Sequence, residues 1–150
     1  MKKIFAAVTA LTLLVFSFQA QADDRKATAE NLVKAAIAHY QKVGEEQAYA
    51  DFSKKDSEFF HGEFYIFVMS AETGSHVYHA VNEKLVGKNL LGLKDTSGKL
   101  FVKELYENAN KQGATWTTYQ WPHPQTKKIE PKVVYTEKHG NLLFSTGYYE

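Results

Sequence analysis

The chain has 150 residues, with 18 lysine and arginine side chains against 17 aspartate and glutamate side chains, and it has no cysteine. Disulfide bonds and a lipid anchor on an N-terminal cysteine are therefore excluded, so the fold depends on its core alone. The near balance of charge argues against nucleic acid or an anionic membrane surface as a partner.

The first 22 residues have the pattern of a secretory signal peptide. Lys2 and Lys3 give a positive start, a largely apolar run follows over residues 4–18, and residues 20–22 (Ala-Gln-Ala) match the small-x-small cleavage pattern. This apolar run is shorter than the roughly 20 residues that span a bilayer. The sequence therefore predicts cleavage after Ala22, a periplasmic or secreted location, and no membrane insertion after cleavage.

Residues 23–150 have the length of one domain, and this domain is predicted to begin with a long amphipathic helix. Asp23 and Asp24 suit its start, because carboxylates favour the positive end of the helix dipole. Gly44 is the expected stop, and a short second helix is expected over residues 45–53. The apolar stripe of the first helix consists of Ala29, Leu32, Val33, Ala36, Ile37 and Tyr40.

From residue 64 onward the pattern changes to strands. Residues 64–69 are apolar at every position, which is typical of a central strand covered on both faces. A turn at residues 72–75 and a return strand at 77–80 follow, and then a long loop over 84–98. Further on we expect a helix over residues 101–113, because Phe101, Val102, Leu105, Tyr106 and Ala109 repeat at helical spacing. Strands are expected over 114–121, 131–138 and 142–149, with a hairpin turn at 139–141. The order predicts an α+β fold, with a long N-terminal helix, an antiparallel sheet of about five strands and a middle helix.

Several motifs follow one another along the mature chain. They are Phe64–Val68 followed by Gly74, His79 with Leu85–Leu90, Asp95–Lys99, Trp116–Pro124, Lys132 with Tyr135, and Thr146–Tyr149. In this order they resemble the motifs of a single Cache domain, the extracytoplasmic relative of PAS domains in bacterial chemoreceptors and sensor kinases. Ala80 and Thr115 depart from that pattern, since proline and glycine are common at the matching positions.

This resemblance implies a curved antiparallel sheet that carries a small-molecule pocket, with small organic acids as typical ligands. A receptor of this kind would continue beyond residue 150 into a membrane helix and a signalling module. The signal is therefore expected to pass to a separate partner, either a membrane sensor or a transporter. No cofactor is expected.

Aromatic residues gather around one basic side chain near the end of the chain, which suits a pocket for a small anionic molecule. Lys132 is the predicted carboxylate partner, and the alternative is a solvated lysine at a sheet edge. Lys132 and Tyr135 point to opposite faces of a regular strand, so both line one pocket only if a bulge or a strand end intervenes. The residues predicted to bind the ligand are Tyr65, His79, Tyr119, Trp121, Lys132 and Tyr135.

Other kinds of site have weaker signals. The spacing of His76 and His79 puts their rings on opposite faces of a regular strand, and no cysteine or convergent carboxylate is near, so no metal site is predicted. Asp95 is expected to cap backbone groups of its own loop. No Gly-x-Ser-x-Gly elbow or paired acids indicate an enzyme. The alternative function is a ligand-free interaction module whose N-terminal helix, residues 23–43, pairs with a partner or with its own copy.

Overall fold

The computed structural model describes the backbone of residues 6–150 and the side chains of residues 21–150. The predicted signal peptide lies almost entirely outside the described side chains, so its cleavage stays a prediction. Within the part of the chain that the structure describes, no helix combines the length and the apolar character needed to cross a membrane.

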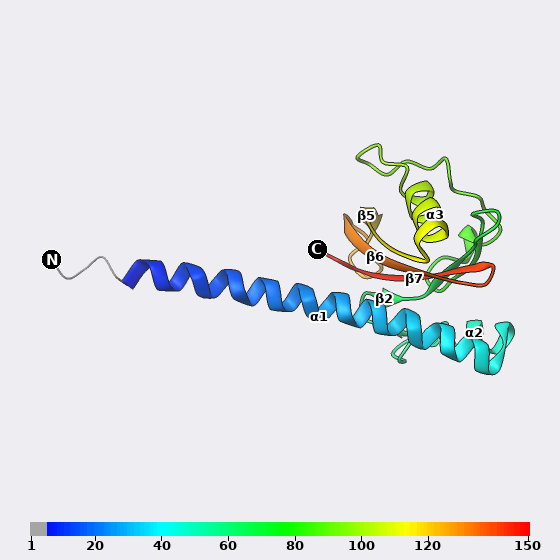
Figure 1. Cartoon of the computed structure of the whole chain (residues 1–150), viewed down its shortest axis with the longest axis horizontal. Helices are drawn as coiled ribbons and strands as arrows, with labels where there is room; N and C mark the ends of the chain where they lie inside the picture. Colours follow the sequence, from blue (N-terminus) through cyan, green and yellow to red (C-terminus); the bar gives the residue numbers. More distant parts are fainter. Residues whose placement is uncertain (1–5) are drawn as a thin grey trace.

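Helix α1 (Ala6–Val43) lies along one face of the sheet, and helix α3 (Phe101–Gln112) covers the other face (Figure 1). The predicted stripe of α1 is confirmed, because five of its six residues are buried: Ala29, Leu32, Val33, Ala36 and Ile37. Gly44, with a φ of 83°, separates α1 from the short helix α2 (Glu45–Phe52). A glycine suits this position because side chains with a Cβ disfavour positive φ.

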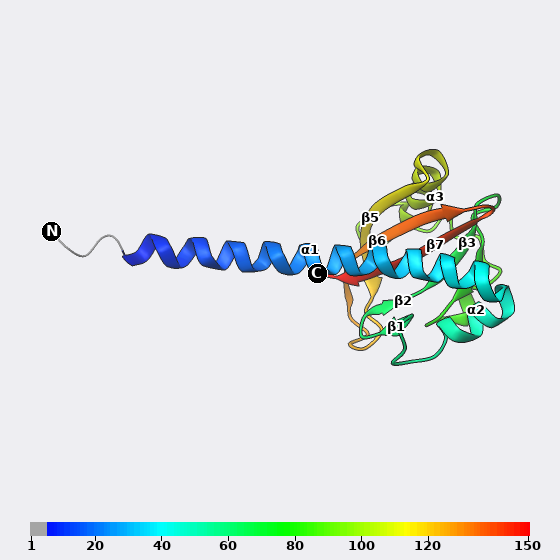
Figure 2. The ribbon, with the colours of Figure 1, turned by 60° about the horizontal axis from the view of Figure 1, so that its bottom comes forward.

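The five-stranded sheet is antiparallel throughout, as predicted, with the strand order β4-β3-β7-β6-β5 (Figure 2). Its strands are β3 (Phe67–Ser70), β4 (His76–His79), β5 (Ala114–Pro122), β6 (Ile129–His139) and β7 (Leu142–Tyr149). The strand expected over residues 64–69 is split. Its first part, β2 (Phe64–Tyr65), pairs with β1 (Phe60–His61) in a small separate sheet. The long loop before α3 contains one 3-10 turn, η1 (Glu83–Leu85).

The sheet divides the interior into two apolar clusters. The first lies between the sheet and helices α1 and α2, and includes Phe52, Ile66 and Phe144. The second lies between the sheet and α3, and includes Phe67, Phe101 and the other buried residues of that helix. Side chains of a strand alternate between the two clusters. The face that each residue of the predicted site occupies is therefore fixed by its strand register.

Candidate ligand-binding site

The structure brings five of the six predicted site residues to the sheet face beneath α3. Tyr65 and Tyr119 belong to the cluster on that face, and Trp121 packs against it. The His79 ring lies 5.4 Å from the Tyr65 ring, and the Lys132 ammonium lies 3.9 Å from the centroid of Tyr65. Residues from β2, β4, β5 and β6 thus converge although they are far apart in sequence.

The sixth predicted residue, Tyr135, is not brought to this face. Strands β6 and β7 pair in continuous register, with Lys132 opposite Tyr149 and Tyr135 opposite Thr146. No bulge intervenes, so Tyr135 points to the α1 side, where its ring lies 5.1 Å from that of Trp116. The expectation that Tyr135 and Lys132 share one pocket is therefore wrong, because regular alternation separates them.

Lys132 is completely buried. Its Nζ donates a hydrogen bond of 2.6 Å to the Tyr65 hydroxyl, and it lies 5.4 Å and 5.3 Å from the ring centroids of Phe67 and Tyr149. It forms no salt bridge with an Asp or Glu among the residues whose side chains are described. The alternative of a solvated edge lysine is excluded for this position.

Burial is the main influence on the charge of Lys132. It lowers the pKa of the ammonium group, while the hydroxyl of Tyr65 and the more distant Glu63 act in the opposite direction. A buried cation without a carboxylate partner is costly, since the low-dielectric interior replaces its hydration only in part. An anion that reached Lys132 would remove much of this cost.

Tyr149, opposite Lys132, connects this site to α1. Its backbone N–H donates to Glu63 Oε2 at 2.8 Å, and its carbonyl accepts from Arg25 Nη1 at 2.7 Å. Its hydroxyl donates to the carbonyl of Pro122 at 2.9 Å. The end of β7 is therefore fixed by hydrogen bonds both near Lys132 and to Arg25 of α1.

His79 is a neutral donor in this site. Its Nδ1 accepts from the backbone N–H groups of Val81 and Asn82 at 3.3 Å and 3.2 Å, so the ring carries its proton on Nε2. Burial, followed by the nearby charges of Lys132 and His76, lowers the pKa of His79 to about 3. The imidazole is therefore uncharged at neutral pH.

This shift predicts an acid-sensitive fold. Because the pKa of His79 is lower in the folded state than in the unfolded state, stability is complete above about pH 6.5 and falls as the pH drops toward 3, by at most about 1.4 kcal/mol per pH unit. His79→Asn, which keeps an acceptor near the Nδ1 position, is expected to flatten this slope. Urea unfolding between pH 4.5 and 6.5 measures it. The exposed His61→Gln is the control, and an unchanged slope in His79→Asn would contradict the assignment.

His76 lies on the same face as His79, which the spacing argument did not predict. Met69 pairs with His76 and Val68 pairs with Tyr78, so the register shifts between them and Val77 is bulged out of the ladder. Because of this bulge, both imidazoles stack on Phe67, at 6.2 Å and 5.5 Å between ring centroids. The prediction of opposite faces was therefore wrong, although no group of three metal-ligating side chains occurs among the described residues.

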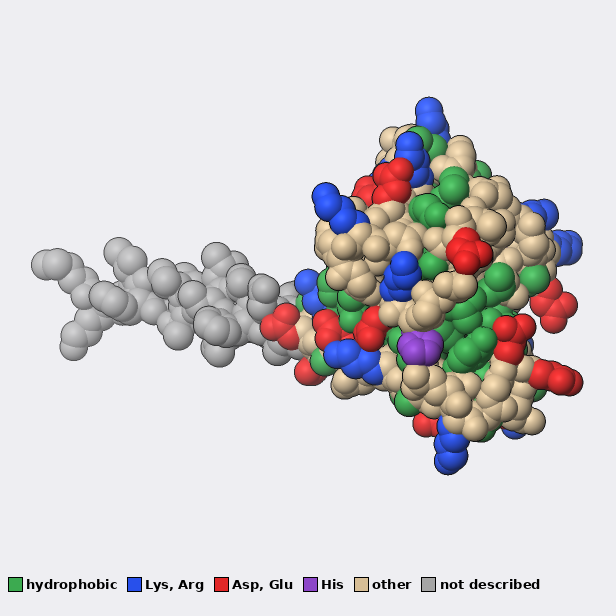
Figure 3. Space-filling model, turned by 45° about the vertical axis from the view of Figure 1, so that its right-hand side comes forward, with side chains coloured by type: hydrophobic (Ala, Val, Ile, Leu, Met, Phe, Trp, Pro, Cys, Tyr) green, Lys and Arg blue, Asp and Glu red, His purple; other side chains and the backbone are tan. Residues whose placement is uncertain are grey.

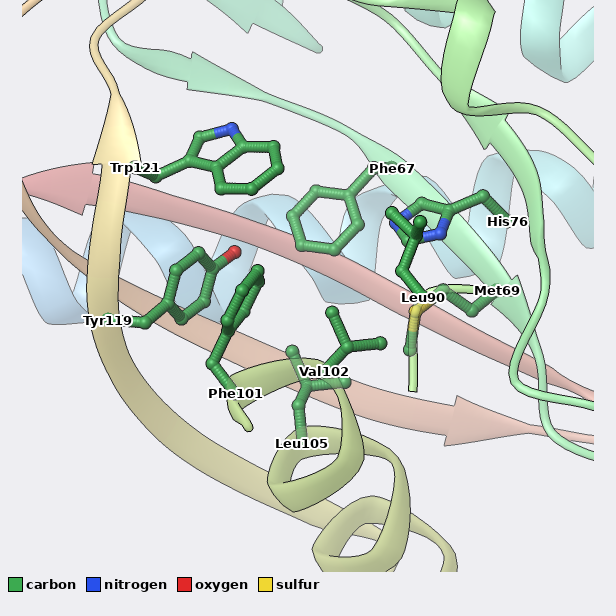
Figure 4. A pocket seen from close by; sticks show the side chains of 9 residues that line it. All are labelled: Phe67, Met69, His76, Leu90, Phe101, Val102, Leu105, Tyr119 and Trp121. Atoms are coloured by element: carbon green, nitrogen blue, oxygen red, sulfur yellow. The ribbon is translucent and has the colours of Figure 1, made fainter. Parts of the chain in front are cut away.

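A small cavity lies at the centre of this face (Figure 4). Its volume is about 10 Å³, room for about one water molecule. Phe101 is one of the residues that line it, and it stacks on Tyr119 with 4.2 Å between ring centroids. The cavity is lined by Phe67, Met69, His76, Leu90, Phe101, Val102, Leu105, Tyr119 and Trp121. Of the predicted binding residues, Tyr119 and Trp121 line this cavity, and Tyr65, His79 and Lys132 do not. The site is thus closed in this conformation.

Most of this lining was not predicted from the sequence. Phe101 and Val102 had been assigned only to the apolar stripe of a helix, and Leu90 to a loop and to the Leu85–Leu90 motif, with no binding role. The apolar stripe of this helix did indicate which side of α3 faces the sheet. It did not indicate that this side meets the predicted binding residues. That information comes only from the packing of α3 on β5.

Asp95 has the capping role that was expected. Its Oδ1 accepts from the backbone N–H groups of Ser97 and Lys99, and its Oδ2 accepts from that of Gln120. These contacts, with the Gln120 N–H first, lower the pKa of Asp95 to about 2. Asp95 thereby fastens the loop before α3 to β5, beside Tyr119.

Comparisons with known proteins agree with this architecture. A family model described as single Cache domain 2 matches residues 17–149. A methyl-accepting chemotaxis protein from Vibrio parahaemolyticus RIMD 2210633 has a similar structure, with a TM-score of 0.75 and 22% identity over 91% of this chain and 95% of that one. A Cache chemosensory domain, described as a structural basis for carboxylic acid recognition, has a TM-score of 0.70 and 17% identity over 88% and 95% of the two chains. The periplasmic sensor domain of a chemotaxis protein has a TM-score of 0.64 and 21% identity, over 90% and 96%.

Proposed function

The chain belongs to the single Cache domain 2 family, and from this premise we propose that it is an exported sensor domain that binds a small organic carboxylate. The expected partner that receives the signal is a membrane sensor or a transporter. No enzymatic activity and no cofactor are proposed. Basic and acidic side chains are interspersed on the face shown in Figure 3, so a nucleic acid partner is not proposed either.

The observation that carries this proposal is the burial of the Lys132 ammonium group without an acidic partner in the described part of the chain. This group is buried, is held by Tyr65, and lacks a carboxylate partner among the described residues. A ligand carboxylate would supply the missing charge through a charge-assisted hydrogen bond. Tyr119 and the Nε2–H of His79 are the further donors nearby. The Cache chemosensory domain described with carboxylic acid recognition has a similar fold, which supports the same ligand class.

Binding requires the site to open, because the present cavity holds about one water molecule. Phe101 and Leu90 are the side chains to be displaced. Phe101 is the first residue of α3, and the preceding Leu100 provides no side-chain cap for the helix. An uncapped first turn has unsatisfied N–H groups and opens more readily than a capped one. The loop before α3 and the first turn of α3 therefore form the proposed entrance.

A thermal-shift screen of short organic acids and amino acids tests the proposal. Carboxylates are expected to raise the melting temperature, because a ligand of the folded state stabilises it by mass action. Lys132→Ala should weaken the best acid by about 1.5–3 kcal/mol, the range for hydrogen bonds to charged groups. Lys138→Ala, an exposed lysine on the same strand, is the matched control. Equal affinity in the two variants would remove Lys132 from the site.

The alternative of a ligand-free interaction module has less support. The apolar stripe that would pair with a partner is already buried against β6 and β7 of the same chain. A flat screen together with a dimer in size-exclusion chromatography would nevertheless favour that alternative over the sensor.

A further inference from the structure

A second polar group, His76, lines the cavity itself, whereas Lys132 lies outside that lining. His76 is 5% exposed and lines the cavity, and its Nδ1 has no hydrogen-bond partner among the described residues (Figure 4). Leaving a buried polar nitrogen unpaired is unfavourable, so a group that could pair with it would be stabilised there. A hydroxyl suits either tautomer of the ring, because it can both donate and accept.

Phe67 is on β3, which lies between the strand of His76 (β4) and the strand of Lys132 (β6) in the sheet. Its ring centroid is 5.4 Å from Lys132 Nζ and 6.2 Å from the centroid of His76. A molecule that contacts both must therefore run along the ring of Phe67. The remaining lining near this path is apolar and includes Met69, Leu90 and Val102. The middle of such a molecule is consequently expected to be a hydrocarbon chain.

The charge of the site fits one carboxylate. Lys132 is the only buried lysine or arginine within residues 21–150. Burial lowers the pKa of both His76 and His79, which keeps the two imidazoles neutral. A second carboxylate at the His76 end would be buried without a counter-charge, and this is strongly unfavourable.

We propose that the ligand is a monocarboxylate with a hydroxyl group at the far end of a short aliphatic chain, Lys132 binding the carboxylate and His76 the hydroxyl. This inference rests on the proposed function and narrows it to one class of acid. His76 then determines specificity, whereas Lys132 determines whether any acid binds.

Titration calorimetry with matched acids tests this assignment. The probes are butanoate, pentanoate and hexanoate, each compared with its terminal hydroxy acid and with the dicarboxylate of the same length. At the best length, the hydroxy acid is expected to bind the wild type at least about fivefold more tightly than the plain acid, the effect of a typical net hydrogen bond. The dicarboxylate is expected to bind at least about tenfold more weakly than the hydroxy acid, because its second charge stays uncompensated.

His76→Phe should abolish the preference for the hydroxy acid and leave the affinity for the plain acid within about twofold, as the ring stacking on Phe67 is retained. His61→Phe, at an exposed histidine, should change neither. If His76→Phe does not fold, ¹⁵N NMR of the wild type replaces it: the hydroxy acid should shift the Nδ1 resonance of His76, and the plain acid should not.

Two outcomes overturn the inference in different ways. The hydroxy-acid assignment is contradicted if acids bind through Lys132 but show no preference that depends on His76. It is also contradicted if dicarboxylates bind most tightly. Both results leave the proposed sensor function intact. Failure of every acid to bind the wild type contradicts the proposed function as well.

Discussion

Replacing Lys132 by methionine is expected to stabilise the ligand-free protein while it strongly weakens the binding of carboxylates. The wild type buries an ammonium group that only the Tyr65 hydroxyl and aromatic rings accompany. Methionine has a similar length, fills the same volume and removes the desolvation cost, at the loss of one hydrogen bond. We expect the free energy of unfolding to rise by about 1–3 kcal/mol, measured by urea denaturation.

The pH dependence gives this prediction a second readout. Because the pKa of Lys132 is lower in the folded than in the unfolded state, the wild type gains stability as the pH rises toward the unfolded value of 10.5. The advantage of Lys132→Met should therefore shrink in alkaline buffer. Lys138→Met, at an exposed position of the same strand, should lie within about 0.5 kcal/mol of the wild type. A marked loss of stability in Lys132→Met would mean that the lysine is retained for the fold and not for a ligand.

Truncating Phe101 to alanine is expected to open the site. Phe101 is buried at the start of α3 and stacks on Tyr119, so its removal should cost about 3–4 kcal/mol of stability. The same change leaves space for bulkier acids beside Tyr119, which pairs with Lys132 across strands β5 and β6. In a thermal-shift assay, phenylacetate should stabilise Phe101→Ala and leave the wild type unchanged.

Phe52→Ala separates opening of the site from loss of stability. Phe52 is equally large and completely buried, but it lies in the cluster beneath α1 and α2. Its truncation should cost a similar free energy and should not admit phenylacetate. If the two variants respond alike to acids, Phe101 is an ordinary core residue and the proposed entrance is wrong.

The sequence was sufficient for the elements of the fold because its signals are local. The stripe of α1 and the apolar residues of α3 recur at helical spacing, and Gly44 ends the first helix at a positive φ. The strand break at Ile66 was missed, because a continuous apolar run does not reveal where pairing changes from β1 to β4 and β7. That change depends on tertiary contacts.

The site was predictable only in part. Alternation along β6 showed that Lys132 and Tyr135 face opposite sides, but it could not tell which side meets α3. The bulge at Val77, which turns His76 toward Phe67, arises from the pairing of β4 with β3 and has no glycine or proline to mark it. Strand period alone therefore gave the wrong face for one of the two histidines.

The near absence of free volume under α3 has a thermodynamic consequence. When the conformation that can bind the ligand is rarely populated, the apparent dissociation constant equals the intrinsic dissociation constant divided by the fraction of molecules in that conformation. If one molecule in about a hundred has Phe101 displaced, half-occupancy needs roughly a hundredfold more ligand than the contacts themselves would require. The ligand concentration needed for half-occupancy then depends on how often Phe101 is displaced as much as on the contacts of the Lys132 ammonium group. Substitutions of residues that pack around Phe101 can therefore change this concentration without contacting the ligand.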